Sequence, residues 1–373
     1  MFELHAAHYR RDPAKKSREL LVALLVQGGL TREAIMPRPL ATLLHISDLH
    51  IGRIDPTTGD AAISPAVQLG LDNLPIFDGL LGHRARALRD LAEFVHRMRT
   101  NDEQFQLVVT GDLSRQGDAS ELALARRYFE SEIDLSPPNG RYVGLYTGGS
   151  HLTIPGNHDH WAGVSLPIGA TPSNYYHYFI RALPAIRNIP LGSTDHVLTL
   201  IEVDSDADVP PNSIQRAFAR GSFRSQLLSL DNMLAPRKAS EARVLVIHHA
   251  PTWTSFGLAM TASTKRELDR FLLQHGIRVI LCGHTHEASM RRHYAGTAEC
   301  WECGAGSTTQ FDTLPLKWRR RLRRQAEANL KPNSLLLHRI FDVDGRLEWS
   351  ATSYLRTASG FHATYPPRQF ALL

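Results

Sequence analysis

The stretch LLHISDLH at positions 43–50 places an aspartate and a histidine directly after a short, mostly apolar run. Four further stretches repeat this arrangement: LVVTGD at 107–112, LTIPGNHD at 152–159, VLVIHH at 244–249 and VILCGHTH at 279–286. Short apolar runs bounded by turn residues are typical of buried strands. Polar residues just past such strands lie at the carboxyl edge of an α/β sheet, where rigid elements hold them in place. The pattern therefore predicts an α/β fold with one polar site at the strand ends.

The polar residues that end these stretches are of the types that bind transition metals. Carboxylate, imidazole and one carboxamide form a donor set that suits Mn, Fe, Zn or Co better than Ca or Mg. No cysteine occurs among these terminal polar residues, which argues against a closed structural zinc site. Two metals about 3.5–4 Å apart can clamp the attacking and leaving oxygens of a phosphoryl substrate. A carboxylate such as Asp112 can bridge two such ions, so the sequence predicts a dinuclear centre.

The five motifs together resemble those of the calcineurin-like metallophosphoesterases. That family carries Asp-x-His, Gly-Asp, Gly-Asn-His-Asp or -Glu, a single His and Gly-His-x-His in this order, and the likeness spans about residues 40 to 355. The resemblance implies a four-layer αββα sandwich of two mixed sheets, with the dinuclear metal site at the strand ends. It also implies two divalent or trivalent transition-metal ions, Mn, Fe or Zn, as cofactors.

The resemblance assigns a role to each matching position. One metal would be bound by Asp48, His50, Asp112 and His286, and the other by Asp112, Asn157, His248 and His284. His158 would be the general acid that protonates the leaving oxygen, with Asp159 orienting its ring. Two histidines adjoin in the fourth motif, and the family places its ligand first after the strand, which selects His248. Alternate residues of an extended chain face opposite ways, so His249 should point elsewhere.

Details around the motifs resemble one branch of the family, the cyclic-nucleotide and glycerophosphodiester phosphodiesterases. They are the Ser114 and Gly117 that follow Gly111-Asp112, the Ala250-Pro251 that follow the paired histidines, and the pair Asp204-Ser205. The branch implies hydrolysis of a small phosphodiester by in-line attack of a metal-bridging hydroxide. Two alternatives stay open. The chain could be a phosphomonoesterase or nuclease of the same family, or a module that binds nucleic acid or another partner and keeps a vestigial metal site.

The composition sets further limits. The 373 residues include 42 Lys and Arg against 37 Asp and Glu, a net charge of +5 that suits an anionic substrate without demanding nucleic acid. Three cysteines form no disulfide framework, which favours a reducing, cytoplasmic location. Cys300 and Cys303 have the spacing of a metal knuckle or redox pair, but two incidental thiols are the simpler interpretation. No apolar run is long enough to span a membrane, and the oligomeric state is left open.

The expected domain boundaries follow the motifs. We expect an N-terminal helical extension at 1–38, a phosphoesterase domain at 39–356 and a C-terminal tail at 357–373. Insertions at about 53–81, 161–193 and 317–331 are long for connectors, and long loops near a site carry specificity. They supply the candidates for substrate contact, which are Arg53, Tyr175 and Arg320.

Two of these candidates belong to clusters with simpler interpretations. The aromatic residues around Tyr175 have the spacing of a small packed helix. The five arginines at 319–324 could be a solvated helix face or a platform for phosphate backbones and anionic membranes.

Several secondary-structure elements can also be placed. Helical spacing predicts crossover helices at 84–99, 120–133 and 263–273. The family resemblance implies another helix at 222–230, after the pair Asp204-Ser205. The pair Asp344-Gly345 lies between apolar runs at 334–341 and 347–354, which is a strong hairpin signal.

Overall fold

The structure is a computed structural model in which residues 38–64, 67, 79–135, 142–163, 173–179, 182–192, 194–211, 213–254, 258–311 and 331–372 are described. The chain separates into two units, Met1–Pro39 and Leu40–Leu373. The expected extension at 1–38 lies outside the described residues except for Arg38. Parts of all three expected insertions also lie outside them, including the arginines at 319–324.

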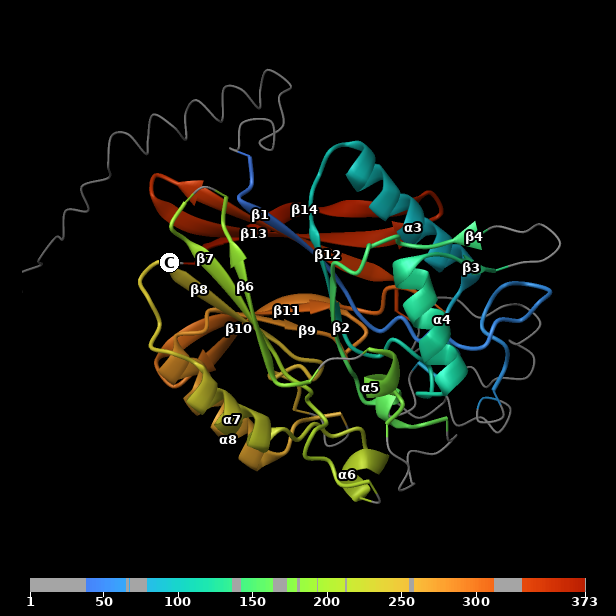
Figure 1. Cartoon of the computed structure of the whole chain (residues 1–373), viewed down its shortest axis with the longest axis horizontal. Helices are drawn as coiled ribbons and strands as arrows, with labels where there is room; N and C mark the ends of the chain where they lie inside the picture. The colour runs from blue at the N-terminus through green and yellow to red at the C-terminus, as the bar shows by residue number, and fades with distance from the viewer. Residues whose placement is uncertain are drawn as a thin grey trace, which may run out of the picture. The chain divides into compact units, whose positions relative to one another are not determined.

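Two six-stranded mixed sheets form the centre of the second unit (Figure 1). The first sheet has the order β14 (Gly360–Ala371), β13 (Arg346–Thr357), β12 (Ser334–Val343), β1 (Ala41–Ile46), β2 (Gln106–Thr110) and β5 (His151–Ile154). The second has the order β10 (Ala288–Ala295), β11 (Ala298–Ala305), β9 (Val279–Cys282), β8 (Glu241–Val246), β7 (Val197–Glu202) and β6 (Ala185–Pro190). A two-stranded sheet pairs β3 (Ile133–Asp134) with β4 (Tyr142–Val143).

The strands that precede the five motifs run parallel within each sheet. In the first sheet β1 pairs in parallel with β2, and β2 with β5. In the second sheet β7, β8 and β9 are parallel neighbours. The carboxyl ends of parallel strands meet at one edge of a sheet. The chain therefore carries the polar ends of β1, β2 and β5 to one edge, and those of β8 and β9 to another.

Helices cover the outer faces of both sheets. Helices α3 (Ala85–Thr100) and α4 (Ala119–Glu130) lie against the first sheet, and α7 (Arg224–Met233) and α8 (Ala262–His275) against the second (Figure 1). The side chain of Asp118 caps α4 by accepting a hydrogen bond from the amide of Ser120, and that of Thr261 caps α8 in the same way. Gly276 ends α8 with a φ of 61°, a left-handed conformation that glycine adopts at low cost. The expected four-layer αββα sandwich is confirmed.

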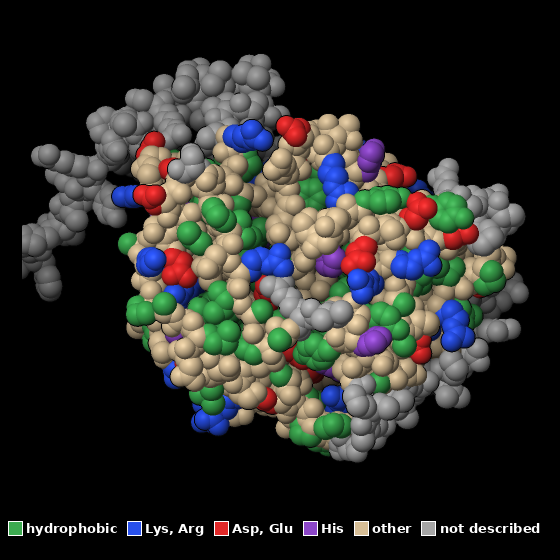
Figure 2. Space-filling view, in the orientation of Figure 1, with side chains coloured by type: hydrophobic (Ala, Val, Ile, Leu, Met, Phe, Trp, Pro, Cys, Tyr) green, Lys and Arg blue, Asp and Glu red, His purple; other side chains and the backbone are tan. Residues whose placement is uncertain are grey.

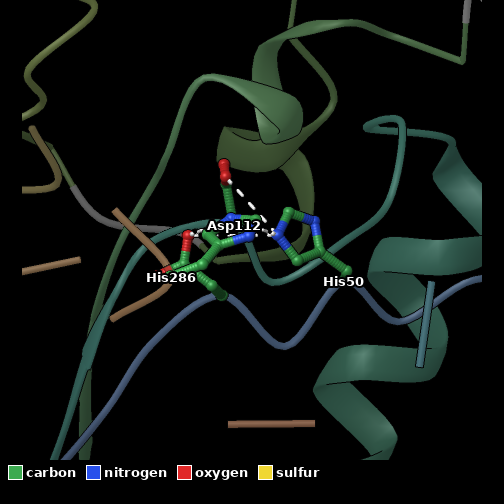
Figure 3. A group of neighbouring side chains, drawn as sticks. His50, Asp112 and His286 are labelled. Atoms are coloured by element: carbon green, nitrogen blue, oxygen red, sulfur yellow. Dashed lines mark hydrogen bonds and ion pairs between the residues drawn. The ribbon is translucent and has the colours of Figure 1, made fainter. Parts of the chain in front are cut away.

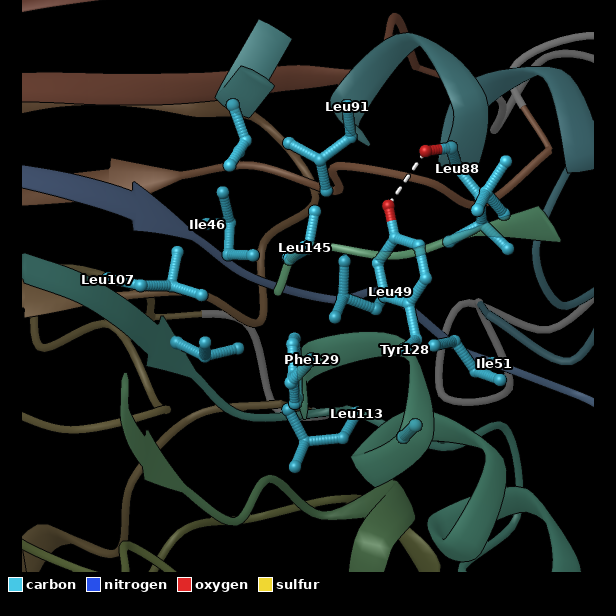
Figure 4. Close-up of a cluster of buried hydrophobic side chains, with 14 of the residues drawn as sticks. Ile46, Leu49, Ile51, Leu88, Leu91, Leu107, Leu113, Tyr128, Phe129 and Leu145 are labelled. Carbon is cyan, nitrogen blue, oxygen red and sulfur yellow. Dashed lines mark hydrogen bonds between the residues drawn. The ribbon is translucent and has the colours of Figure 1, made fainter. Parts of the chain in front are cut away.

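Three apolar layers separate the sheets and helices, and neighbouring residues of one strand enter different layers. Leu44 of β1 packs in the layer under α3 and α4, whereas Leu43 packs between the sheets. Figure 4 shows Ile46 of β1 and Leu91 of α3 in the first of these layers. Val244 of β8 likewise lies between the sheets, and Leu245 lies under α7 and α8. Both faces of these strands are buried, so their sequences are continuously apolar and do not alternate. Each large aliphatic side chain buried in this way contributes about 1.5–3 kcal/mol.

Most of the expected elements are present. The helices expected at 84–99, 222–230 and 263–273 correspond to α3, α7 and α8. The expected hairpin joins β12 and β13, and Asp344 and Gly345 have the positive φ values, 56° and 78°, that a tight two-residue turn requires. Helix α4 ends at Glu130, because the chain enters strand β3 at Ile133. Among the described residues, no helix is both long and apolar enough to cross a bilayer.

The expected tail at 357–373 requires a correction. Residues Gly360–Ala371 form strand β14, which pairs antiparallel with β13 along the outer edge of the first sheet. Phe370 stacks on Trp301 of the second sheet at 4.8 Å between ring centroids, so the segment closes the layer between the sheets. Pro367 obscures this strand in the sequence, since proline cannot donate to a ladder. An edge strand tolerates such a residue, and β14 has only one neighbour.

Candidate metal centre

Loops that follow β1, β2, β5, β8 and β9 converge where the two sheets meet. The loops are tied together by their backbones. The amide of Asp48 donates to the carbonyl of Gly111 at 3.0 Å, and the amide of Gly283 donates to the carbonyl of His248 at 3.0 Å. All seven residues expected as ligands come together here, and all are buried: Asp48, His50, Asp112, Asn157, His248, His284 and His286.

The first group consists of Asp48, His50, Asp112 and His286, whose ligand atoms all lie within 4.8 Å of one another. The Nε2 atom of His286 lies 3.2 Å from Asp48 Oδ1 and 3.2 Å from His50 Nε2. Figure 3 shows His50, Asp112 and His286 pointing toward one another from separate loops. Two imidazoles and two carboxylates around one point can hold a single ion.

The second group shares Asp112 with the first. Ligand atoms of Asp112, His248 and His284 lie within 4.8 Å of one another. His248 Nε2 is 3.3 Å from Asp112 Oδ2 and 3.1 Å from the carboxamide oxygen of Asn157. His284 Nδ1 lies 3.1 Å from the same His248 nitrogen. Asp112 is thus the only residue common to both groups, as a bridging ligand would be.

The far nitrogens of three of the four expected ligand histidines have partners that fix which nitrogen faces the centre, whereas Nδ1 of His50 is buried without a hydrogen-bond partner among the described residues. His248 Nδ1 lies 2.7 Å from the carbonyl oxygen of Thr110, and His284 Nε2 lies 3.0 Å from that of Leu258. His286 Nδ1 lies 2.9 Å from the Gln310 carboxamide. Such outer partners orient ligand imidazoles and raise their basicity. Sequence reasoning missed Gln310 and Leu258, because neither lies in or beside a motif.

The paired histidines of the fourth motif face different ways. His249 Nδ1 lies 2.7 Å from Ser205 Oγ, and its Nε2 lies 3.0 Å from the Ala219 carbonyl oxygen. Both nitrogens of His249 are therefore engaged outside the two ligand groups. Its ring packs beside that of His284, with centroids 4.2 Å apart. This is the arrangement that alternation along an extended chain predicts, with His248 turned toward the centre.

The backbone at the centre is held in an unusual conformation. Five of the expected ligands have positive φ: Asp48 (51°), His50 (48°), Asp112 (51°), His284 (67°) and His286 (55°). The left-handed region costs a non-glycine residue about 1–2 kcal/mol, and such residues cluster at functional sites. The clustering gives a signal for a functional site that is independent of residue type.

The motif glycines leave room for the ligands. A Cβ on Gly156 would lie 2.2 Å from Asp112 Oδ1, and one on Gly283 would lie 2.6 Å from Asp48 Oδ2. A Cβ on Gly111 would lie 2.5 Å from His248 Nδ1. Atoms do not approach so closely, so any larger residue would displace a ligand side chain. This explains why glycine precedes the ligand in three of the five motifs.

Electrostatics keep most ligands in the form that metals bind. Burial opposes ionisation of Asp112, but His248 and the other nearby histidines hold the pKa of this carboxyl well below its usual range. Burial and neighbouring histidines keep the pKa of His50 and of His284 well below 6.5, so both rings are neutral. Burial alone would also lower the pKa of His248, but Asp112 raises it to about 10. In the metal-free protein one proton therefore sits on His248, and a bound cation would have to displace it.

His158 lies next to both groups but is held differently from the expectation. Its backbone amide donates to Asp112 Oδ1 at 2.9 Å, and its ring stacks on Trp161 at 4.3 Å between centroids. Its Nδ1 lies 2.7 Å from the carbonyl oxygen of Arg115, which can only accept. Nδ1 therefore carries a hydrogen, and Nε2 is the nitrogen left to exchange a proton with a ligand.

Asp159, which the family resemblance implies orients the His158 ring, makes its hydrogen bonds to another part of the site. Its carboxylate accepts hydrogen bonds from the backbone amides of Leu113, Ser114 and Gly156 at 3.1, 2.9 and 3.0 Å. It also accepts one from Ser114 Oγ at 2.7 Å. Asp159 thus joins the loop that carries Asp112 to the loop that carries Asn157. Every residue except proline has a backbone amide that can donate, so residue types do not indicate such contacts, and the sequence could not predict this role of Asp159.

The three residues expected to contact the substrate differ in their exposure to solvent. Tyr175 is 1% exposed, its hydroxyl lies 3.1 Å from Thr153 Oγ1 and its ring stacks on Phe179, so it belongs to the core and cannot touch a substrate. Arg53 is exposed on the loop after His50. Arg320 lies outside the described residues.

The cysteine pair is not a metal knuckle. Cys300 and Cys303 are buried on β11 in different apolar layers, Cys300 under α7 and α8 and Cys303 between the sheets. Residues three apart on a strand face opposite ways. Burial raises the pKa of Cys300 to about 12 and raises that of Cys303 as well, so neither is a reactive thiolate.

A family model identifies the class of protein. The model of the calcineurin-like phosphoesterases matches residues 41–288, a range that includes all five motifs. The chain belongs to this family. The domain of the family is a metallophosphoesterase domain, which hydrolyses phosphoester bonds. Members of this family typically bind two metal ions, and the clustered Asp and His side chains described above could hold such ions.

Solved structures similar to this chain share little sequence with it. A single mutant of Vps29 from Entamoeba histolytica is 11% identical, covers 88% of this chain and 99% of its own, and has a TM-score of 0.34. Vps29 from Chaetomium thermophilum is 12% identical, covers 89% and 100%, and has a TM-score of 0.32. A putative 5′-nucleotidase from Staphylococcus aureus, in complex with α-ketoglutarate, is 10% identical, covers 89% and 54%, and has a TM-score of 0.35. No curated protein sequence matches the chain at a significant level.

Proposed function

We propose that this chain is a metal-dependent phosphodiesterase that hydrolyses a small, nucleotide-like or glycerophosphodiester substrate. The observation that carries the proposal is the pair of ligand groups that share Asp112, with His158 beside them. Sharing one carboxylate brings two ions close enough to contact one phosphoryl group. We place this activity in the second unit of the chain, Leu40–Leu373, with β14 as part of the domain.

The residues present fit two transition-metal ions. One would be held by Asp48, His50, Asp112 and His286, and the other by Asp112, Asn157, His248 and His284. The mixed nitrogen and oxygen donors suit Mn, Fe or Zn. Ions bound there would supply positive charge that polarises a phosphoryl oxygen and lowers the pKa of water. The low pKa of Asp112 and the neutral rings of His50 and His284 leave these donors free for coordination.

His158 is the residue that we assign to proton transfer. Its Nδ1 is occupied by the Arg115 carbonyl, which leaves Nε2 to face a ligand. A proton held on Nε2 can then be given to the leaving alkoxide of a diester, a step that an unactivated ester needs. Trp161, stacked on the ring, restricts its rotation. A general acid placed in this way typically contributes about 10²–10⁴-fold to the rate.

Charge distribution favours a small substrate over a long polyanion. On the face shown in Figure 2, basic and acidic side chains are interspersed and form no continuous basic surface. A polynucleotide contacts many phosphates and needs such a surface. The net charge of +5 is modest for a chain of this length. A small phosphate ester in the cytoplasm, where three free cysteines are stable, fits these features better than nucleic acid does.

Two assays separate this proposal from the alternatives. Metal-loaded protein should hydrolyse bis-p-nitrophenyl phosphate, with higher kcat/KM than for p-nitrophenyl phosphate, and the Asp112→Asn variant should not. Higher kcat/KM for the monoester would assign the chain to the phosphomonoesterases of the family. Absence of turnover with both esters, in protein shown to contain two ions, would favour a binding module with a vestigial site.

A further inference from the structure

A third cluster of ligand-type residues lies outside the two groups already described. It consists of His160 at the end of the short helix η4 (His158–His160), and Asp204 and Asp206 in the loop after β7. One ligand atom from each of the three lies within 4.8 Å of the others. All three side chains are buried, with exposures of 7%, 1% and 6%. The cluster uses none of the seven residues of the dinuclear centre.

Asp206 is the member whose burial is unexplained. Its Oδ2 atom is buried and has no hydrogen-bond partner among the described residues. The nearest imidazole nitrogen, His249 Nδ1, is 3.7 Å away and is hydrogen-bonded to Ser205 Oγ instead. An unpaired buried carboxylate oxygen is costly, and a bound cation would stabilise it.

The other two members already have the geometry of coordinating atoms. His160 Nε2 lies 3.1 Å from Asp204 Oδ1. Donor atoms bound to one ion at about 2.0–2.2 Å lie roughly 3–4 Å apart, so the observed separation fits a shared ion without movement of the backbone. Tyr176, whose hydroxyl donates to Asp204 Oδ2, and the amide of Asp206, which donates to Asp204 Oδ1, hold this carboxylate in place.

We propose that His160, Asp204 and Asp206 form a third metal site, specific for a divalent transition ion and separate from the dinuclear centre. One imidazole and two carboxylates suit Zn²⁺ or Mn²⁺, with water completing the coordination. The ion would neutralise the two carboxylates, of which only Asp204 is paired in the metal-free protein. The side chain of Arg216 donates to the His160 carbonyl at 2.9 Å and contributes one positive charge nearby. The Arg216 side chain, however, donates no hydrogen bond to Asp206 Oδ2.

The third site adjoins the second ligand group through His249. His249 Nδ1 lies 3.7 Å from Asp206 Oδ2, and the ring of His249 also packs against that of His284, with centroids 4.2 Å apart. A third ion would therefore be separated from the second ligand group by this ring and would have its own ligands. The dinuclear centre and the third site can therefore be emptied independently by substitution.

The test is a metal count on the full chain with Zn²⁺ alone and with Mn²⁺ alone, by equilibrium dialysis and elemental analysis. Wild-type protein should bind three ions and Asp206→Asn two, with the affinity of the third equivalent lowered by about 100-fold or more, since loss of a mere outer partner already costs 10–100-fold. The matched control is Asp208→Asn, on the same loop, where the carboxylate caps α7 by accepting from the amide of Ser225. This control should still bind three ions.

A crystal soaked in Zn²⁺ locates the third ion directly. Anomalous scattering should place it between His160 Nε2 and the two carboxylates, and the peak should vanish in His160→Asn. The Asp112→Asn variant should lose ions of the dinuclear centre while keeping this one, so failure of the dinuclear assignment and failure of the third site give different results. The proposal is overturned if wild type binds only two ions, or if Asp206→Asn binds as many ions as wild type.

Discussion

The Nδ1 atom of His158 lies 2.7 Å from the backbone carbonyl oxygen of Arg115, in the loop that follows β2. The candidate acid is therefore positioned by the same loop that carries the shared ligand Asp112. A carbonyl oxygen accepts under all conditions, unlike a carboxylate, which can be protonated. The contact assigns the hydrogen of the neutral ring to Nδ1 and leaves Nε2 as the nitrogen that can exchange a proton with a ligand.

His158→Ala should separate chemistry from metal binding. The ring is not a member of either ligand group, so metal content should stay near that of the wild type. Turnover of an alkyl phosphodiester should fall by about 10²–10⁴-fold. Esters with good leaving groups need little protonation, so the loss should be smaller for bis-p-nitrophenyl phosphate. Equal losses for both ester types would contradict the role of His158 as an acid.

Asp159→Asn tests whether this carboxylate orients the ring or joins two loops. Asparagine keeps one acceptor oxygen but turns an amino group toward the backbone amides of Leu113, Ser114 or Gly156. Leaving one such buried donor unpaired costs about 1–3 kcal/mol. We therefore expect a lower melting temperature and weaker binding of both ions, measured by calorimetry. A variant with normal stability and metal content but slow turnover would instead support ring orientation.

Asp112→Asn should weaken both metal sites at once, because Asp112 is the only residue that belongs to both groups. Asparagine has one coordinating oxygen and no charge, so it cannot bridge two cations. Elemental analysis after gel filtration should find neither ion of the dinuclear centre at full occupancy in this variant, so that about one ion per chain remains, at the third site proposed above. The informative control is Asp48→Asn, which belongs to the first group alone and should spare the second ion. Retention of two tightly bound ions by Asp112→Asn would show that the bridge is assigned to the wrong residue.

Acid should destabilise the fold through His338, which lies in β12 away from the metal centre. Burial lowers the pKa of His338 to about 3, against about 6.5 in an unfolded chain. Between these values the unfolded chain binds more protons than the folded one, so stability falls as pH drops from 6.5 toward 3.

The slope due to one such histidine is at most about 1.4 kcal/mol per pH unit. His338→Gln should flatten the dependence of the free energy of unfolding on pH by up to this amount, measured with urea at several pH values. The matched control is His362→Gln, the same substitution at an exposed position. An unaltered slope in His338→Gln would mean that the ring is already charged in the folded protein.

Motif residues were the part of the site that the sequence could predict. Residues of metal-ligand type, such as Asp48 and His284, closely follow apolar runs that are typical of buried strands. The alternation of strand and helix patterns along the chain predicted the four layers of the fold. The sequence could not predict the contacts that orient those ligands. Thr110, Arg115 and Leu258 act through backbone carbonyl oxygens, and any side chain could stand at such positions. Gln310 reaches His286 only because the chain returns to the centre after β11.

Two errors had definite physical causes. Tyr175 stands near a motif in the sequence, but its hydroxyl finds a partner in Thr153 and its ring finds one in Phe179, which buries it. Proximity along the chain gave no information on which way the ring would turn. The strand β14 was missed because Pro367 interrupts the usual strand signal, and only the presence of an unpaired edge on β13 makes a further strand favourable there.

The position of β1 between β12 and β2 constrains the order in which the protein can be completed on a ribosome. Ala41 pairs with Ile340 on one side, while Leu43 pairs with Gln106 on the other. Until β12 emerges, one edge of the strand that leads to Asp48 and His50 has no neighbour, and an unpaired apolar edge invites association with other chains. A nascent chain stopped before β12 should therefore depend on chaperones. The loops that carry the metal ligands would be synthesised long before the sheet that supports the first of them is closed.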